Sequence, residues 1–298
     1  MLPLGYAKSH GLTLLELVVV LGILAALSTV AIRSLEPVAD QARYQQSQKL
    51  LDELRNAVVG ESNLSASNVS AMGFVADTGA LPANAHQLLQ RPVSLIDRTL
   101  HVFDSDRDTV QDVQLVGGWN GPYLQFGAGR NDVVDGWGRA PTFLSGLGSL
   151  EMLSLGSDGD STSPEDGYRE DIIVSVQSTD YMGTLVLRLF AIDGLNGSRV
   201  DPSPTGSQQL GVLCYAVNAA GGTTGAIEEQ LIVIGNSGSF EYRRDNTIKG
   251  TLAVRAILWN DVNNDDVLDI GESIVNKSIV HYVTVQARVD NRVEMELR

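Results

Sequence analysis

The sequence has a single cysteine, Cys214, in 298 residues, and therefore no internal disulfide can form. Cys214 lies in the apolar run 211–217, where we expect a small buried side chain rather than a nucleophile. The histidines after residue 11, which are His86, His101 and His281, accompany no nucleophile motif, zinc-ligand spacing or phosphate-binding glycine loop. We therefore expect that the protein is not an enzyme.

Basic residues are scarce as well. Lys and Arg number 21 against 36 Asp and Glu, so the formal net charge is -15. A surface that binds phosphates needs clustered Lys and Arg, and we therefore expect no nucleic-acid partner. An acidic excess belongs either to a solvated surface or to cation-binding loops, and the spacing of the carboxylates distinguishes the two.

Long apolar stretches are absent except at the N-terminus. Residues 12–32 are apolar with five interruptions, which are Thr13, Glu16, Gly22, Ser28 and Thr29. Roughly 21 helical residues span about 30 Å, the thickness of the hydrocarbon core of a bilayer, so we expect a single transmembrane helix. A secretory signal peptide would end at a small-residue cleavage site, whereas this stretch continues into a polar helix. A plain anchor would not explain Glu16, because a carboxylate near mid-membrane costs about 2.5 to 3.5 kcal/mol.

The segment from Gly11 to Leu27 begins Gly-Leu-Thr-Leu-Leu-Glu and resembles the prepilin processing motif of type IV pilins and pseudopilins. The resemblance implies that prepilin peptidase cuts after Gly11 and that the new amine of Leu12 is methylated. It also implies a single-pass protein of the bacterial inner membrane, with its globular part in the periplasm and later in a filament. Lys8, in the segment removed, would stay on the cytoplasmic side.

Glu16 is tolerable in lipid if a cation meets it, and cleavage creates a new ammonium on every subunit. The Leu12 amine of one subunit can neutralise Glu16 of its neighbour and so set the axial register while the apolar helices pack. The expected partners are prepilin peptidase, other pilin or pseudopilin subunits and the inner-membrane assembly platform.

Helical periodicity continues beyond the apolar stretch. Tyr44, Leu51, Leu54 and Val58 recur at helical spacing, which predicts one stripe that packs on a globular domain. Pro37 removes a backbone donor and is expected to kink or loosen the helix there, and Gly60 is expected to end the helix.

Between residues 61 and 180, several patches resemble the core of the major pseudopilin of type II secretion systems. They are Gly73 to Pro82, Ala85 to Gln90, Gly118 to Leu124, Asp135 to Phe143, and Ser154 to Asp160 with Asp171 to Ile173. The resemblance implies a small β-sheet domain packed on the long helix. Trp119, Tyr123, Trp137 and Phe143 are expected in the core of that domain.

The loop 155–171 gathers six carboxylates, which are Asp158, Asp160, Glu165, Asp166, Glu170 and Asp171. Carboxylates and backbone carbonyls are the ligands that calcium prefers, and the resemblance also implies calcium here. The expected ligands are Leu155, Asp158, Asp160, Asp166 and Asp171. Arg169 stands where the family has an aspartate, so either Glu165, Asp166 or Glu170 supplies the missing oxygen or Arg169 replaces the ion.

Beyond residue 180, runs rich in β-branched or alternating residues predict strands. They are Leu185 to Ile192, Leu210 to Val217, Gln230 to Ile234, Thr251 to Trp259, Ile279 to Ala287 and Val293 to Leu297. Several strands in this length predict a β-sandwich of immunoglobulin-like type.

A second acidic loop lies within these strands. Its oxygen-bearing residues, Asp261, Asn263, Asp265, Asp269 and Glu272, together with the backbone of Val267, have the spacing of a twelve-residue calcium loop. Asp266 stands at the usual glycine position, and aspartate tolerates positive φ better than most residues. The alternative is a solvated acidic turn; a calcium site of this kind would have a Kd of about 0.1 to 1 mM.

Together these patterns predict an α+β protein in four parts: a leader over 1–11, a hydrophobic helix over 12–60, a pseudopilin-like domain over 61–180 and a β-sandwich over 181–298. The expected function is that of a calcium-stabilised structural subunit of a type II secretion pseudopilus or type IV pilus-like filament. The alternative is a minor pilin or adhesin of a surface pilus whose C-terminal β domain binds a ligand.

Overall fold

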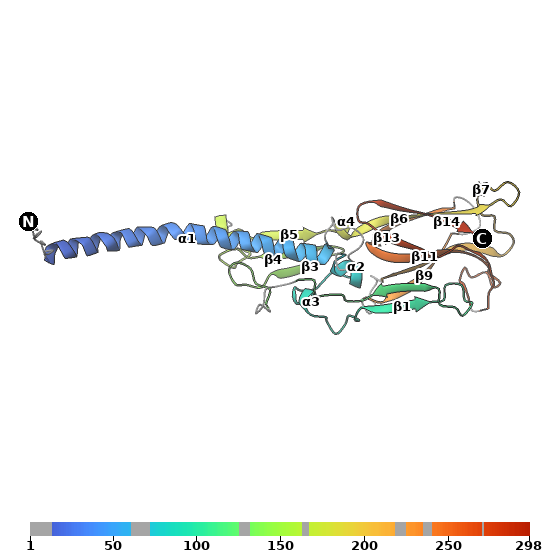
Figure 1. Cartoon of the computed structure of the whole chain (residues 1–298), viewed down its shortest axis with the longest axis horizontal. Helices are drawn as coiled ribbons and strands as arrows, with labels where there is room; N and C mark the ends of the chain where they lie inside the picture. Colours follow the sequence, from blue (N-terminus) through green and yellow to red (C-terminus); the bar gives the residue numbers. More distant parts are fainter. Residues whose placement is uncertain are drawn as a thin grey trace, which may run out of the picture.

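The computed structural model describes residues 14–60, 72–124, 132–162, 167–217, 225–234, 240–269 and 271–298, without the side chains of 30–35. The protein is α+β: a long N-terminal helix precedes a region rich in β-sheet. In Figure 1 the first half of this helix projects from one end of an elongated body, and the C-terminal strands lie at the other end.

Helix α1 spans Leu14–Val59, 46 residues, and continues through Pro37. It ends at Gly60, whose φ of 79° lies in the left-handed region that glycine adopts without a Cβ clash. The Gly60 N–H donates to the carbonyl of Asn56 at 2.6 Å, which closes the last turn. The predicted end of the helix is therefore confirmed.

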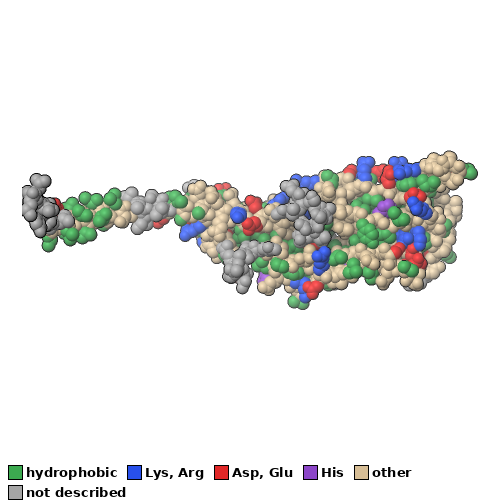
Figure 2. All heavy atoms as spheres, viewed as in Figure 1, with side chains coloured by type: hydrophobic (Ala, Val, Ile, Leu, Met, Phe, Trp, Pro, Cys, Tyr) green, Lys and Arg blue, Asp and Glu red, His purple; other side chains and the backbone are tan. Residues whose placement is uncertain are grey.

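The projecting half of α1 has an apolar surface. Leu14, Leu17, Leu21 and Leu24 are each more than half exposed, and hydrophobic side chains cover this part of the stalk in Figure 2. Among the residues that the structure describes, no helix is both long enough and apolar enough to cross a membrane.

The second half of α1 packs on a small antiparallel sheet. Strands β3 Thr142–Ser145, β4 Leu150–Ser154 and β5 Ile172–Val176 form this sheet in that order. The short helices of this part are α2 Phe74–Thr78, α3 His86–Leu89, η2 Gly167–Arg169 and α4 Ser178–Tyr181. Leu51, Leu54 and Val58 are fully buried in the shared core, which confirms the predicted stripe. The predicted core aromatics Trp119, Tyr123, Trp137 and Phe143 also pack against it.

The C-terminal region forms two sheets. Their strands are β6 Met182–Ile192, β7 Arg199–Val200, β8 Gln208–Val217, β9 Ile227–Val233, β10 Glu241–Ile248, β11 Gly250–Asn260, β12 Ile274–Lys277, β13 His281–Val285 and β14 Asp290–Leu297. One sheet has the order β10-β6-β14 with β7 beside β6, and the other has the order β12-β11-β8-β9 with β13 beside β11. β14 pairs with β6 in parallel, and the other pairs are antiparallel.

The two sheets enclose one apolar core. Alternate residues of β6, among them Leu185 and Leu187, meet Val212 of β8 and Val254 of β11 there. All six predicted strand regions are present, whereas β7, β10 and β12 were not predicted. β10 carries Glu241, Arg243, Arg244 and Asp245, so its strand conformation follows from pairing with β6 rather than from an apolar pattern.

A hairpin from the middle of the chain covers the outer face of the second sheet. It consists of β1 Thr99–Phe103 and β2 Val113–Gly117. Val113 and Leu115 of β2 are buried against Tyr215 of β8 and Trp259 of β11, and β2 also contacts β9; Figure 1 shows the hairpin at the C-terminal end of the molecule. The central strands β8 and β11 are therefore buried on both faces, and residues 99–117 pack with the C-terminal strands rather than with α1.

Candidate functional site

The predicted processing segment lies at the tip of α1. Gly11 and Leu12 are outside the described residues, and Glu16 lies in the first turn of the helix. Its side chain is exposed between the exposed apolar residues Leu15 and Leu17. A carboxylate in this apolar surface is suitably placed to meet a group from another molecule.

The structure brings together part of the predicted acidic loop 155–171. Asp158 Oδ1 accepts a hydrogen bond from the Asp160 N–H at 3.3 Å. Asp171 Oδ1 is buried and has no hydrogen-bond partner among the described residues. Burial raises the pKa of Asp171, and the nearby charges of Asp158 and Asp160 raise it further. Asp166 lies outside the described residues.

Arg139 contacts the backbone of the loop 155–171. The Arg139 guanidinium donates to the carbonyls of Gly156 at 2.7 Å and Ser157 at 3.2 Å. It lies so close to Gly159 that an added Cβ would come within 2.6 Å of it. The predicted ligand Leu155 already uses its carbonyl to accept the Gly159 N–H at 2.9 Å. The prediction considered Arg169 as the cation of the loop, and Arg139 was missed because it is distant in sequence.

The second predicted loop joins β11 to β12. Asp261 is fully buried, and its carboxylate accepts the backbone N–H groups of Asp265 at 3.3 Å and Asp266 at 3.0 Å. Asp266 has a φ of 60°, so aspartate does adopt the left-handed conformation at the glycine position. The Val267 N–H donates to Asp265 Oδ1 at 2.9 Å.

Hydrogen bonds of Asn263, Asp269 and Glu272 close the loop 261–272. The Asn263 amide nitrogen donates to carboxylate oxygens of both Asp265 and Asp269, each at 3.0 Å. Glu272 accepts the N–H groups of Val262 at 2.8 Å and Asp269 at 3.0 Å. The spacing thus brings the predicted side chains into one closed loop.

A third group of carboxylates was not predicted. Asp104, Asp106 and Asp108 follow β1, and one oxygen from each lies within 4.8 Å of the others. The alternating aspartates of residues 104–108 were the sequence signal that could have revealed this group.

Residues 6–32 match the prokaryotic N-terminal methylation motif. This match indicates a type IV pilin-like prepilin signal and a membrane-anchored N-terminus. No curated protein matches the chain.

One solved structure resembles part of the chain. It is a Pseudomonas aeruginosa protein, PA1324, that bears the provisional description of a carbohydrate binding protein. The two share 11% sequence identity over 39% of this chain and 88% of that one, with a TM-score of 0.23. A TM-score this low supports no inference about a shared fold or ligand.

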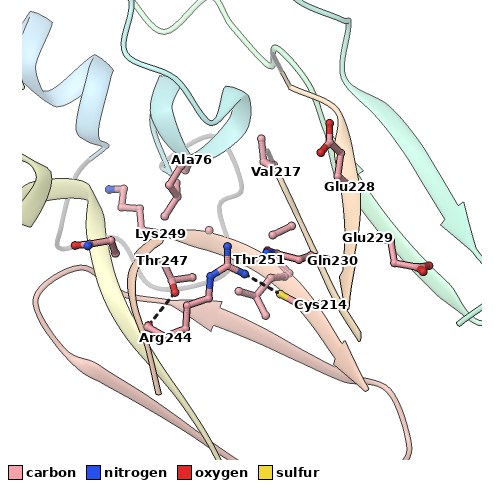
Figure 3. A pocket seen from close by; sticks show the side chains of 15 residues that line it. Ala76, Cys214, Val217, Glu228, Glu229, Gln230, Arg244, Thr247, Lys249 and Thr251 are labelled. Atoms are coloured by element: carbon pink, nitrogen blue, oxygen red, sulfur yellow. Dashed lines mark hydrogen bonds between the residues drawn. The ribbon is translucent and has the colours of Figure 1, made fainter. Parts of the chain in front are cut away.

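A cavity of about 420 Å³ lies in the body of the molecule, where α2 meets the C-terminal strands. It is lined by Ala76 of α2, Cys214 of β8, Arg244 and Thr247 of β10, and Lys249 between β10 and β11 (Figure 3). Arg244 points at Cys214, with 3.9 Å between the guanidinium nitrogen and Sγ. Cys214 is buried as predicted, and burial raises the pKa of its thiol despite the nearby guanidinium.

Lys249 provides a test of this cavity, because burial lowers its pKa from 10.5 to about 8. The folded state therefore holds this proton less firmly than the unfolded state, and the resulting destabilisation is complete below pH 8. We expect Lys249→Met to raise the free energy of unfolding at pH 7 by about 1 kcal/mol, a value reduced for the residual exposure of the side chain. The gain should shrink as the pH rises from 8 towards 10.5.

Urea denaturation of the full chain in detergent at pH 7 and pH 10 measures this difference. Lys49→Met is the matched control, because the Lys49 side chain is 79% exposed. Equal effects of the two substitutions at pH 7 would contradict the assignment.

Proposed function

We propose that the protein is a structural subunit of a type II secretion pseudopilus or type IV pilus-like filament. Prepilin peptidase cuts it after Gly11, and the new amine of Leu12 is methylated. The match of residues 6–32 to the methylation motif carries this proposal. The exposed apolar surface of α1 supports it, because soluble monomers rarely leave so large an apolar surface uncovered.

In this proposal two environments cover the stalk in turn. Before assembly, residues 12–32 cross the inner membrane once, and the body lies in the periplasm. The assembly platform then transfers the helix into the filament, where neighbouring helices cover it. Apolar helices in lipid associate through packing and polar contacts rather than through the hydrophobic effect, so a specific polar pair matters for assembly.

Glu16 supplies that pair by meeting the Leu12 ammonium of a neighbouring subunit. The pair offsets the cost of each charge in an apolar surrounding, and it can form at only one axial offset between subunits. Glu16 therefore sets the register of assembly rather than the insertion of the helix.

We expect Glu16→Ala to leave the amount of protein in the membrane fraction unchanged but to abolish the ladder of cross-linked subunits. The substitution leaves the Leu12 ammonium without its partner, while it makes the helix more apolar. Cross-linking in cells followed by immunoblotting measures both. Glu36→Ala is the matched control, since Glu36 lies on the same helix beyond the apolar stretch. A ladder of normal intensity with Glu16→Ala would refute the register role.

A second candidate function is that of a minor pilin or adhesin of a surface pilus. The position of the C-terminal sheets favours it, because they lie at the opposite end of the molecule from the stalk and would face outward from a filament. In this candidate the sheets form an immunoglobulin-like binding domain.

Deletion of the chain from its host separates the two candidates. For a pseudopilin we expect loss of secreted proteins from the culture medium, while the yield of sheared surface fibres stays unchanged. Loss of the fibres with normal secretion would instead support the surface pilus.

We also propose that calcium stabilises the subunit. In the loop 261–272, the fully buried Asp261 and the Asn263 amide that joins the carboxylates of Asp265 and Asp269 support a site. Rotation of the Asn263 amide would present its oxygen in place of the nitrogen; it breaks the hydrogen bonds to Asp265 and Asp269, which contacts with a bound cation would replace. Asp261, Asn263, Asp265, Val267, Asp269 and Glu272 would hold the ion.

In the loop 155–171, Leu155, Asp158, Asp160, Asp166 and Asp171 would hold a second ion. The unpartnered buried oxygen of Asp171 supports this assignment. The contacts of Arg139 with two loop carbonyls favour the alternative, in which a side-chain cation stabilises the loop.

Calorimetric titration of the full chain in detergent tests these ions, with an expected Kd of about 0.1 to 1 mM. We expect Asp265→Asn to remove one binding event, because it removes a ligand charge while it keeps the acceptor for the Val267 N–H. Asp266→Asn is the matched control, since Asp266 accepts a hydrogen bond from Gln209 instead of facing Asp269. An unchanged titration with Asp265→Asn would exclude the site in the loop 261–272. An unchanged titration with Asp158→Asn would exclude an ion in the loop 155–171 and favour Arg139 as the cation that stabilises it.

A further inference from the structure

The loop between β1 and β2 holds three carboxylates around one point. One oxygen from each of Asp104, Asp106 and Asp108 lies within 4.8 Å of the others. The Asp106 side chain is only 4% exposed, and its Oδ1 is buried without a hydrogen-bond partner among the described residues. A buried carboxylate oxygen without a donor is unfavourable, so a hydrogen-bond donor or a cation beside Asp106 Oδ1 would stabilise this group.

Two basic side chains face the loop from the C-terminal sheet. Arg255 of β11 contacts Asp106 Oδ2 at 3.1 Å and also pairs with Asp112. Lys277 of β12 pairs with Asp106 Oδ2 and lies 3.9 Å from Asp108 Oδ2.

The charges of this group do not balance. Asp104, Asp106, Asp108 and Asp112 contribute four negative charges, whereas the facing Arg255 and Lys277 contribute two positive charges. Arg107, which belongs to the loop itself, pairs with Glu229 at 2.5 Å. The excess of two negative charges equals the charge of one divalent cation.

The backbone of this loop repeats that of the loop 261–269. Arg107 and Thr109 have φ values of 61° and 74°, and the corresponding residues Asn264 and Asp266 have values of 59° and 60°. Left-handed residues therefore occupy the same two positions in both loops.

The hydrogen bonds of the first aspartate repeat as well. Asp104 Oδ1 accepts the Asp108 N–H at 3.2 Å and Oδ2 accepts the Thr109 N–H at 2.7 Å. The Val110 N–H donates to Asp108 Oδ1 at 2.8 Å. Asp261 and Asp265 make the same three contacts in the later loop. Asp104, Asp106 and Asp108 thus stand at the first, third and fifth positions of a calcium loop.

We propose that Asp104, Asp106 and Asp108 bind a divalent cation of the calcium type. Oxygen donors without sulfur or imidazole favour calcium over zinc, and an irregular arrangement of carboxylates suits calcium better than magnesium, which demands octahedral geometry. This site does not depend on the proposed filament function or on the other two loops.

The position of the site gives the cation a structural role. Arg255 is buried on the face of β11 that the β1–β2 hairpin covers, and it joins Asp106 and Asp112 of the hairpin loop to that sheet. Neutralising the remaining carboxylates would remove their mutual repulsion at this contact. Binding therefore fastens the hairpin to the C-terminal strands.

The test uses the full chain in detergent with Asp158→Asn and Asp265→Asn already in place, so that the other two loops contribute nothing. After treatment with a chelator, the protein is titrated with calcium chloride in a calorimeter, and the thermal midpoint is measured with and without calcium. We expect one binding event with a Kd of about 0.1 to 1 mM and a higher midpoint in calcium.

Asp108→Asn is the site variant, because Asp108 is half exposed and asparagine keeps the acceptor for the Val110 N–H. Asp193→Asn is the matched control, since Asp193 accepts the Leu195 N–H at 2.9 Å in the same way as Asp108 accepts the Val110 N–H. We expect Asp108→Asn to weaken binding at least about tenfold and to abolish the calcium-dependent shift, with no change for the control. Equal titrations of the two variants would overturn the proposal.

Lys277→Met tests the alternative explanation, in which the Lys277 ammonium takes the place of a metal ion among these carboxylates. If calcium binds here, removing the competing ammonium should tighten binding. Absence of calcium binding both with and without Lys277 would overturn the site.

Discussion

Burial of the central strands β8 and β11 on both faces of their sheet is the constraint on which the distal half of the molecule depends. Leu252, Val254 and Leu258 of β11 face the four-stranded sheet, while Ala253, Ile257 and Trp259 face the β1–β2 hairpin. A sheet that is apolar on both sides requires a cover on each, and the core between the two sheets supplies only one. The hairpin supplies the second, which is why a segment from the middle of the chain packs so far from its sequence neighbours.

The same constraint places charge in the interior. Arg255 lies between Ala253 and Ile257 on the face that the hairpin covers, and its side chain is 8% exposed. A buried guanidinium requires carboxylates, and the hairpin loop provides them in Asp106 and Asp112. The acidic composition of that loop is therefore part of the packing and not only a property of the surface. A cation among the remaining carboxylates would complete this arrangement.

Helix α1 divides the molecule between two environments. Its second half shares a core with β3, β4 and β5, so it is held by ordinary hydrophobic packing. Its first half exposes leucine and valine side chains, which lipid or other subunits would cover in the proposed filament subunit. One continuous helix thus connects the body to the apolar phase, and Pro37 lies in the region between the two halves without interrupting it. For a filament subunit, this continuity would fix each body at a set distance from its own anchor.

Local patterns determined what lies close together in the sequence. The prepilin signal, the end of α1 at Gly60, six of the C-terminal strands and the closed loop 261–272 all follow from spacing within a few residues, because helix periodicity, glycine conformation and loop ligation are local properties. Only the tertiary structure decided the contact of Arg139 with the loop 155–162, the strand β10 and the docking of the hairpin. These depend on pairing between distant segments. The aspartates at 104–108 depend on both kinds of information. Their alternation is visible in the sequence, whereas the contacts of Asp106 with Arg255 and Lys277 exist only in the folded chain.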